Sequence, residues 1–135
     1  MLPDIEILVV AHLRNTQSVI DLTTRIGTRT PSSLAGQFVK VTVLDDQQTP
    51  GSKALHLVDC LVQIDCYGSS NRDSAHAEAS LLARTVREAV IAMPSASHTG
   101  AVVSSARASS RRLPDTDLEP ARERYIVTGT LSLHP

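Results

Sequence analysis

Apolar side chains near the start of the chain recur at the spacing of an α-helix. From residue 3 to residue 14 they lie three and four positions apart. Asp4 and Glu6 fall in the expected first turn, where negative charge is favourable to the helix dipole. We therefore predict a helix over residues 3–14, followed by a short helical turn near residues 19–22 and a strand-like piece over residues 25–29.

The clearest β pattern covers residues 55–67. In an extended chain successive side chains point to opposite faces. One face of this segment is almost purely apolar and should lie on the core; it carries His56, Val58, Cys60, Val62, Ile64 and Cys66. The other face is mixed and includes Asp59, Gln63 and Asp65, as expected where a sheet meets water or another subunit. We predict a long central strand.

A second, longer helix follows that strand. Polar residues 69–73 supply capping groups, and the apolar spacing predicts a helix that ends at Met93, before Pro94. Its apolar stripe is about 100° wide and should pack on the sheet; it consists of Ala75, Ala79, Leu82, Val86, Ala89, Val90 and Met93. Leu81 and Ile91 project from the opposite side. Because single exposed apolar residues are common, a subunit contact and chance exposure are both open for these two.

Three further segments complete the β pattern. A β-rich run covers residues 38–44, and residues 102–107 begin as a strand that turns polar, which indicates a sheet edge. A final strand covers residues 125–133. The order of elements predicts an α+β fold, with a mixed, mainly antiparallel sheet against which an N-terminal helix and one long helix pack.

Two polar segments are predicted as exposed loops. The first runs from Asp45 and Asp46 to Lys53, has no apolar residue and contains Pro50 and Gly51. The second runs from Ser109 to Arg122 and is rich in both charge signs. Its charges nearly cancel, so a self-screened solvated loop and a docking loop are both open. The candidates for docking in this second loop are Arg111, Arg112, Asp115, Asp117 and Arg122.

Composition narrows the class of protein. The 135 residues fit a single domain over residues 1–135, and with 2% aromatic residues the core must be aliphatic. The formal charge of -1 gives no long-range attraction for phosphate, so we expect no specific nucleic-acid binding. No stretch approaches the roughly 18 consecutive apolar residues of a membrane helix, and acids stand where a secretory signal needs bases. We therefore expect no membrane contact and a protein that stays in the cytoplasm where it is made.

Candidate chemistry is sparse. The sequence has no P-loop, dinucleotide-binding glycine pattern, metal-binding His or Cys motif, or nucleophile elbow. Its five histidines are scattered over different elements, and Asp59 and Asp65 are about 20 Å apart along one strand, too far for an acid/base pair. Cys60 and Cys66 cannot bridge within that strand and are expected to be buried thiols. We predict no catalytic residue, no metal and no cofactor.

Segments spread over the chain together resemble the tail terminator proteins of long-tailed bacteriophages. They are the opening LPDIEILVVAHLR, the block RIGTRTP, the strand VDCLVQIDCYG with the helix AHAEASLLARTVREAVIAM, and the closing RYIVTGTLSL. The likeness covers nearly the whole chain in order and length. It rests on the order of the elements, since no short diagnostic motif is present.

The resemblance implies a virion protein that forms a ring, commonly a hexamer, at the head-proximal end of the finished tail tube. Such a ring stops polymerisation of the tube protein and offers its other surface to the head-tail connector or neck protein. It is assembled in the host cytoplasm, and genomic DNA passes through its lumen without specific binding. No catalysis is required.

On this basis each candidate residue receives an expected role. Leu81 and Ile91 are assigned to contacts between subunits. Docking on tube or connector is assigned to Asp45, Asp46, Lys53, Arg111, Arg112, Asp115, Asp117 and Arg122. Asp59, Gln63 and Asp65 are assigned to the lumen, where acidic walls would repel phosphate.

Two other functions remain open at the level of sequence. One is a head-closure or neck adaptor, or another minor tail-completion protein; an adaptor would bind on the portal side and would not cap isolated tubes. The other is a small-ligand-binding domain or enzyme that uses His12 or His56 in a pocket.

Overall fold

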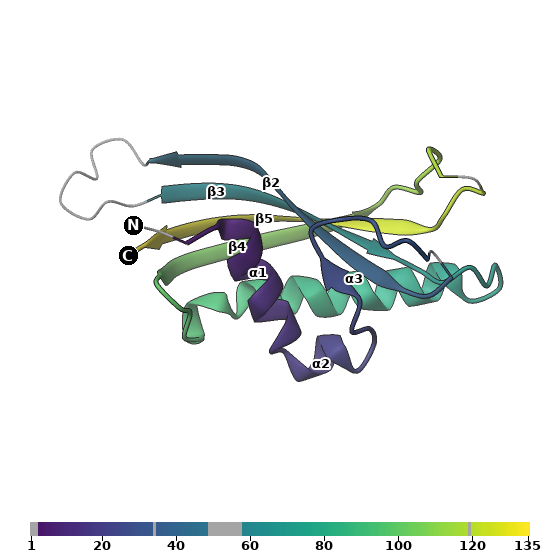
Figure 1. Ribbon diagram of the computed structural model, residues 1–135, viewed down its shortest axis with the longest axis horizontal. Coiled ribbons are helices and arrows are strands. Elements are labelled where there is room, and N and C mark those ends of the chain that lie inside the picture. Colours follow the sequence, from purple (N-terminus) through teal and green to yellow (C-terminus); the bar gives the residue numbers. More distant parts are fainter. Residues whose placement is uncertain (1–2, 34, 49–57, 119) are drawn as a thin grey trace.

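The chain forms one sheet with helices on one side of it (Figure 1). The computed structural model describes residues 3–33, 35–48, 58–118 and 120–135. Its helices are α1 (Ile5–Arg14), α2 (Gln17–Ile20) and α3 (Ala75–Ile91), with a 3-10 helix η1 (Met93–Ser95). Its strands are β1 (Ile26–Gly27), β2 (Phe38–Gln48), β3 (Val58–Tyr67), β4 (Val102–Arg112) and β5 (Arg124–His134).

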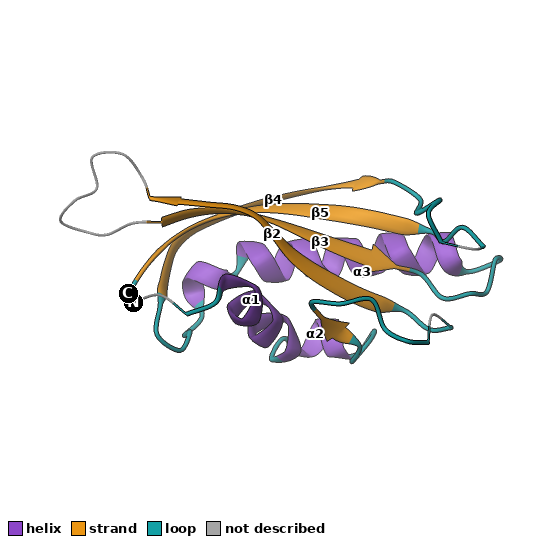
Figure 2. Cartoon of the chain, turned by 45° about the horizontal axis from the view of Figure 1, so that its top comes forward, coloured by secondary structure: helices purple, strands orange, loops and turns teal. Residues whose placement is uncertain are grey.

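The strand order in the sheet is β1-β2-β3-β5-β4. The short β1 pairs with β2 in parallel, and the other neighbours are antiparallel. Figure 2 shows α1, α2 and α3 beneath the sheet, with no described helix above it. The predicted α+β fold, with a mixed and mainly antiparallel sheet, is confirmed. It leaves one side of the sheet, here named the open face, without a covering layer of helices.

The N-terminal helix forms where its sequence pattern predicts. Asp4 caps it, accepting a hydrogen bond of 3.2 Å from the backbone N–H of Ile7. Its apolar stripe is buried against the sheet, and Leu13 is fully buried. Glu6 also accepts a hydrogen bond of 3.0 Å from the backbone N–H of Val43, which ties α1 to strand β2.

Strand β3 occupies the centre of the sheet, between β2 and β5. The predicted alternation holds on its core side, where Cys60, Val62, Ile64 and Cys66 are all buried. No disulfide joins the two cysteines, as expected. Burial raises the pKa of the Cys66 thiol, and the nearby Asp65 carboxylate raises it further.

Helix α3 packs on the sheet through the predicted stripe. Every member of that stripe, from Ala75 to Met93, is buried. The α-helix ends at Ile91, two residues before the predicted end at Met93, and Pro94 lies within η1, which follows it. The predicted capping differs in detail: Ser74 precedes the helix without a side-chain cap, while Glu78 accepts hydrogen bonds from the backbone N–H and hydroxyl of Ser69.

Gly68 allows the tight passage from β3 into α3. A Cβ atom added there would lie 2.2 Å from the carbonyl oxygen of Ala75, far inside any tolerated contact. The backbone N–H of Gly68 also donates to the carbonyl oxygen of Glu123, which extends the β3–β5 ladder by one step. Only glycine fits this position without movement of the chain.

Both predicted loops were set too long. Strand β2 continues to Gln48, so Asp45 and Asp46 lie within a strand; a bulge next to Asp45 shifts its register with β3. Strand β4 continues to Arg112, and the pairing with β5 extends further to a bridge between Asp115 and Arg122. The part of the second segment beyond this bridge is a hairpin tip, whose described residues are 116–118, 120 and 121. Lys53 lies outside the described residues.

Candidate functional site

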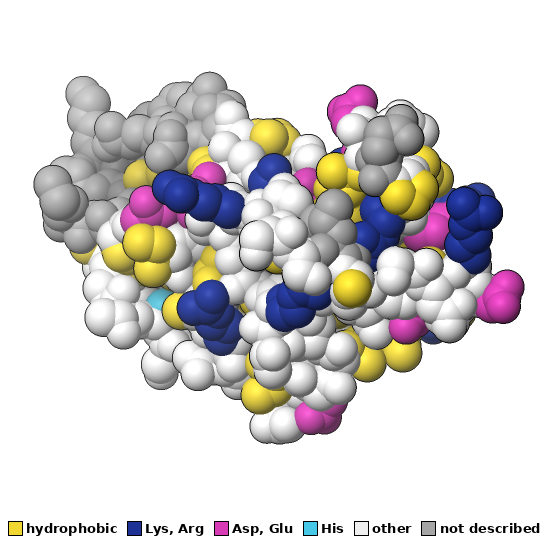
Figure 3. Space-filling view, turned by 45° about the vertical axis from the view of Figure 1, so that its right-hand side comes forward, with side chains coloured by type: hydrophobic (Ala, Val, Ile, Leu, Met, Phe, Trp, Pro, Cys, Tyr) yellow, Lys and Arg dark blue, Asp and Glu magenta, His cyan; other side chains and the backbone are white. Residues whose placement is uncertain are grey.

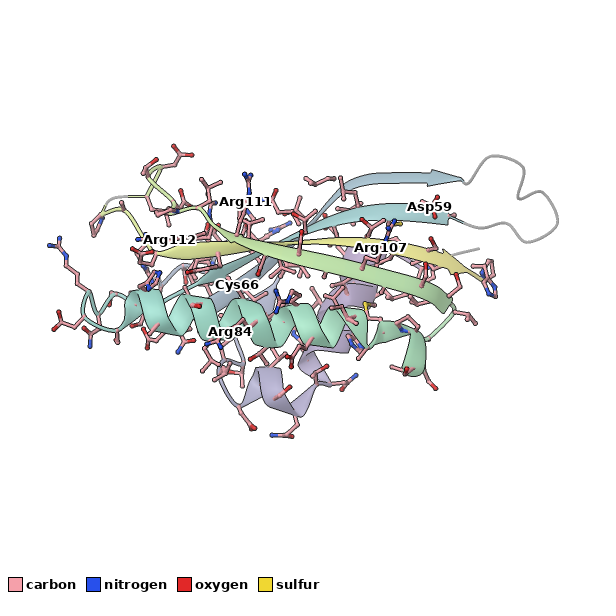
Figure 4. All side chains as sticks on the ribbon, turned by 180° about the vertical axis from the view of Figure 1, so that it is seen from behind. Asp59, Cys66, Arg84, Arg107, Arg111 and Arg112 are labelled. Carbon is pink, nitrogen blue, oxygen red and sulfur yellow. The ribbon has the colours of Figure 1, made fainter. Side chains whose placement is uncertain are left out.

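The open face carries polar side chains in rows that cross the sheet. In one row Lys40 of β2 lies opposite Asp65 of β3, which lies opposite Ile126 of β5, and Ile126 pairs with Arg111 of β4. The next row contains Thr42, Gln63, Thr128 and Ser109. Figure 4 shows Arg107 and Arg111 along β4. The face is thus polar and carries both charge signs.

The residues assigned to the lumen share this face but differ in exposure. Asp65 is 5% exposed and accepts a hydrogen bond of 2.9 Å from Nε2 of Gln63. Asp59 is half-buried and accepts a hydrogen bond of 2.7 Å from the hydroxyl of Ser132. Arg107 and Arg111 are exposed on the same face. Asp59 and Asp65 therefore do not form a row of fully accessible acidic side chains on this face. The assignment of Asp59, Gln63 and Asp65 to the lumen stays a prediction.

One end of the open face is closed by aromatic and basic side chains. The rings of Phe38 and Tyr67 stack with their centroids 4.2 Å apart, and Phe38 is fully buried. The guanidinium groups of Arg25 and Arg124 lie 5.7 and 5.8 Å from the centroids of the Phe38 and Tyr67 rings, respectively. This cover explains why the mixed face of β3 becomes buried toward its end.

Asp115, predicted as a docking residue, belongs to a buried polar network instead. It is 9% exposed, and its Oδ2 accepts a hydrogen bond of 2.6 Å from the hydroxyl of Tyr67. Arg124 approaches both partners, with Nη1 3.6 Å from that Oδ2 and 3.5 Å from the hydroxyl. Burial raises the pKa of Tyr67, and the bond to Asp115 raises it further. The network fastens the start of the hairpin tip to the sheet.

Arg122 is also buried, at 6% exposed. Its Nη2 donates to the carbonyl oxygen of Gly68 and lies 3.5 Å from that of Gly36, so one side chain joins three segments. Burial lowers the pKa of Arg122, with a smaller contribution from the positive charge of Arg25. Asp115 and Arg122 therefore position the hairpin tip, and neither offers a free charge to a partner's surface. Sequence reasoning missed this because Tyr67 and Gly68 are remote in sequence.

Charged residues do remain exposed around the hairpin tip. Arg111, Arg112 and Asp117 are exposed, as a docking surface requires. Arg112 forms a two-pronged ion pair with Glu123, with an Nη2–Oε1 distance of 2.8 Å. This pair lowers the pKa of Glu123 and raises that of Arg112. Figure 3 shows basic and acidic side chains close together at this end of the molecule.

Both edges of the sheet include a stretch of strand that no described strand covers. At one edge lies the whole of β4. At the other, β1 pairs only with Val39 and Lys40, so β2 from Val41 to Gln48 has no strand on its outer side within the described residues. Strand edges of this length readily accept another strand, and proteins usually protect them. Arg107, Arg111 and Arg112 along β4 are the charged residues there.

Leu81 and Ile91 lie on the outer side of α3, as their phase predicts. They are 44% and 49% exposed, which is high for large apolar side chains. Arg84, which lies between them in sequence, is exposed on the side of α3 away from the sheet (Figure 4). The prediction that these two residues contact another subunit is neither supported nor opposed by exposure alone.

His12, one of the two histidines considered as a pocket residue, lines a groove of about 370 Å³ beside α1. The rings of His12 and His98 lie 5.3 Å apart, and their Nε2 atoms donate to the carbonyl oxygens of Ala89 and Met93. Burial lowers the pKa of His12, and the neighbouring His98 adds to that effect. None of the groove's described lining residues is acidic. His56, the other histidine considered, lies outside the described residues.

The described residues hold neither a candidate metal cluster nor a helix that could span a membrane. No three His, Cys, Asp or Glu side chains gather there in a way that could hold a metal ion. Nor is any helix in the described part of the chain long and apolar enough to cross a bilayer.

Comparison with known proteins shows a likeness in fold and none in sequence. No protein-family model matches the chain, and no curated protein matches its sequence. A chain of a solved structure described as "Virion of native gene transfer agent (GTA) particle" superposes with a TM-score of 0.70. The alignment covers 96% of this chain and 94% of that one, at 15% sequence identity. At this identity the likeness establishes a shared fold.

Proposed function

We propose that this chain is a structural protein of a virion and acts as the tail terminator. In this role a ring of copies caps the head-proximal end of the tail tube, stops addition of tube subunits and presents its other side to the head-tail connector. The observation that carries the proposal is the likeness to a chain of the gene transfer agent virion, which spans nearly the full length of both chains. The sequence resemblance to tail terminators supports the finer role.

The two sheet edges suit a ring. A closed ring needs heterologous contacts, in which one surface of each copy meets a different surface of the next. Strand β4 and the outer part of β2 lie at opposite edges of the same sheet, so β4 of one copy can pair with β2 of its neighbour. The available stretch of β2 lies beyond Val43, whose N–H already bonds to Glu6. Repeated around an axis, this contact extends the sheet from copy to copy and leaves no edge exposed.

The backbone of β4 is arranged for such pairing. Leu113 donates its N–H to the carbonyl oxygen of Arg124, which marks these two as a hydrogen-bonded pair. Antiparallel pairs alternate, so the N–H groups of Arg111 and Ser109 also point to β5, while those of Ser110 and Ala108 point outward. These outward groups are the donors that a neighbouring strand would use.

The two predicted docking segments fall at opposite ends of the sheet. The hairpin tip extends from one end, whereas β2 ends and β3 begins at the other (Figure 1). A ring built from these subunits would have one segment on each side, one for the tube and one for the connector. Arg111, Arg112 and Asp117 supply exposed charge on the side of the hairpin tip. Asp45 and Asp46, near the end of β2, keep their expected docking role at the other side.

A tube-growth assay tests the proposal. Purified protein is added to the polymerising tail-tube subunits of the same particle, and tube lengths are measured by electron microscopy. Length-arrested tubes with an added ring at one end are the expected result. Tubes that grow to the same lengths with and without the protein contradict termination; binding to portal-side proteins in the same preparation would instead favour a neck adaptor.

A pair of variants at Ser110 separates ring formation from folding. Ser110→Pro removes one outward N–H of β4, which an edge strand tolerates but a paired strand does not. Ser110→Ala keeps that N–H and serves as the matched control. Capping should be lost with proline and retained with alanine, while both variants keep the circular dichroism of the wild type.

A further inference from the structure

The outer side of α3 carries a regular seam. Ala77, Leu81, Arg84, Glu88 and Ile91 follow one another at alternating steps of four and three residues, the spacing of a helix that packs lengthwise on another helix. On an ideal helix they span about 80°, centred opposite the buried stripe. All five are exposed. We name these five residues the α3 seam.

The seam has a symmetric order. Along the helix, the two charged residues, Arg84 and Glu88, lie between the two large apolar residues, Leu81 and Ile91. Within the described residues neither Arg84 nor Glu88 takes part in an ion pair. Figure 4 shows α3 on the near side of the molecule with Arg84 directed away from the sheet. The seam is therefore accessible along its length.

We infer that the seam binds the seam of a second copy of this chain, with the two helices antiparallel. A two-fold axis at the level of Val86 places Leu81 against Ile91 of the partner subunit and Arg84 against Glu88 of the partner subunit. The same contacts are repeated on the other side of the axis. Every large apolar residue of the seam then gains an apolar partner, and every charge gains an opposite charge.

Charge selects this orientation over the alternative. In a parallel pair, each residue of the seam would face its own copy, so Arg84 would meet Arg84 of the partner subunit and Glu88 would meet Glu88 of the partner subunit. Like charges at helix-packing distance repel, whereas the antiparallel pair has an attraction at both places. The surface is thus complementary to itself, as an isologous contact requires.

The association is weak and depends on concentration. A helix of this length is about 25 Å long, and a contact limited to one helix on each copy buries less than the roughly 1,200 Å² of standard stable interfaces. Ala77 contributes no bulk that would hold the helices apart. In the pair, Leu81 and Ile91 are covered, so they cannot at the same time contact a third protein. The inference does not rest on the terminator proposal, because it concerns the isolated chain.

Charge reversal with rescue tests the pairing. Sedimentation equilibrium is measured for the wild type, Arg84→Glu, Glu88→Arg and the double variant. Each single reversal changes both symmetric contacts at once and should weaken association about tenfold or more. The double variant restores opposite charges and should return to within about threefold of the wild type. Arg72→Glu, an exposed arginine outside the seam, is the control and should leave association unchanged.

Two results overturn the inference. One is a wild-type chain that stays monomeric up to its solubility limit. The other is a double variant as weak as the single variants, because a contact of Arg84 or Glu88 with any other surface would not be rescued by exchanging the two charges. Circular dichroism of every variant confirms that α3 is folded.

Cross-linking gives a second, independent readout. Leu81→Cys mixed with Ile91→Cys should form a disulfide between copies, since the pairing brings these positions together. Leu81→Cys alone should not, because the two copies of residue 81 are then about 15 Å apart along the helices, well beyond disulfide reach. The native Cys60 and Cys66 are buried and do not compete. Efficient linkage of Leu81→Cys to itself would contradict the antiparallel arrangement.

Discussion

The hydroxyl of Tyr67 lies 2.6 Å from Oδ2 of Asp115, and this bond joins the end of the central strand to the base of the hairpin tip. The two residues are 48 positions apart in sequence. Both residues are buried, so a water molecule cannot take the place of either partner in this hydrogen bond. The position of the hairpin tip therefore depends on a polar bond inside the molecule.

Removing the Tyr67 hydroxyl should destabilise the fold. In Tyr67→Phe, Asp115 loses its closest hydrogen-bond donor, which costs about 1–3 kcal/mol for a buried group left short of partners. Urea unfolding measures the change. Tyr125→Phe is the matched control, since the Tyr125 hydroxyl bonds to the exposed His76 and its loss should change stability little. Equal stability of the two variants would show that the buried hydrogen bond contributes no more to the free energy of unfolding than the exposed one.

Gly68→Ala should be more disruptive than its small size suggests. The added methyl group would lie 2.2 Å from the carbonyl oxygen of Ala75, so the β3–α3 connection has to move. Overpacking of this kind costs about 1–3 kcal/mol or more. Gly27→Ala is the control because an added Cβ there meets nothing within 4 Å. Thermal unfolding of both variants decides the point, and a Gly68→Ala protein as stable as Gly27→Ala would refute the close approach.

The protein should lose stability in mild acid through His12. Burial holds the pKa of His12 below its ordinary value of 6.5, so the unfolded chain binds this proton more readily than the folded one. Stability from this group is complete above about pH 6.5 and decreases as the pH falls from there toward the lower folded pKa. His12→Gln should flatten that part of the curve, whereas His134→Gln, near the end of the chain, should leave it unchanged. Denaturant titrations from pH 8 to pH 5 provide the measurement, and an unaltered slope in His12→Gln would contradict this cause.

Charge reversal on the open face should separate Asp59 from Asp65. Asp65 is buried, so Asp65→Lys places an amine where water is excluded and should prevent folding. Asp59 is half-buried, so Asp59→Lys should fold and is the variant that probes a channel wall. If Asp59 lines the lumen, assembled particles with Asp59→Lys should release DNA more slowly, as an added positive charge binds phosphate. Unchanged release from such particles would remove Asp59 from the lumen, and Asp59→Asn is the control for loss of the acid alone.

The elements that could be predicted from sequence are those whose burial imposes a period. Two such elements were located correctly: the alternating strand from Cys60 to Cys66 and the helical stripe from Ala75 to Met93. In each, one face is buried against the core. Strand ends could not be predicted in the same way. Gln47 and Gln48 continue β2, and Ser109 to Arg112 continue β4, because an edge strand accepts polar residues without cost.

The polar interior also escaped prediction. Asp115 and Arg122 occur in a charged segment with two prolines, which indicates an exposed loop. Their burial depends on Tyr67 and on the carbonyl oxygen of Gly68, which only the fold brings close. The amino-acid composition of the charged segment itself gives no indication of these distant partners. Of the described docking candidates, Arg111, Arg112 and Asp117 stay proposed for docking near the hairpin tip, and Asp45 and Asp46 at the far end of the sheet. Asp115 and Arg122 instead hold the hairpin tip in place.

Electron microscopy of particles in which this chain carries a small label tests the central proposal most directly. We expect a closed ring of label at the junction between the head-proximal end of the tail tube and the connector. Label distributed along the tube, confined to the portal side, or missing from finished particles would contradict it.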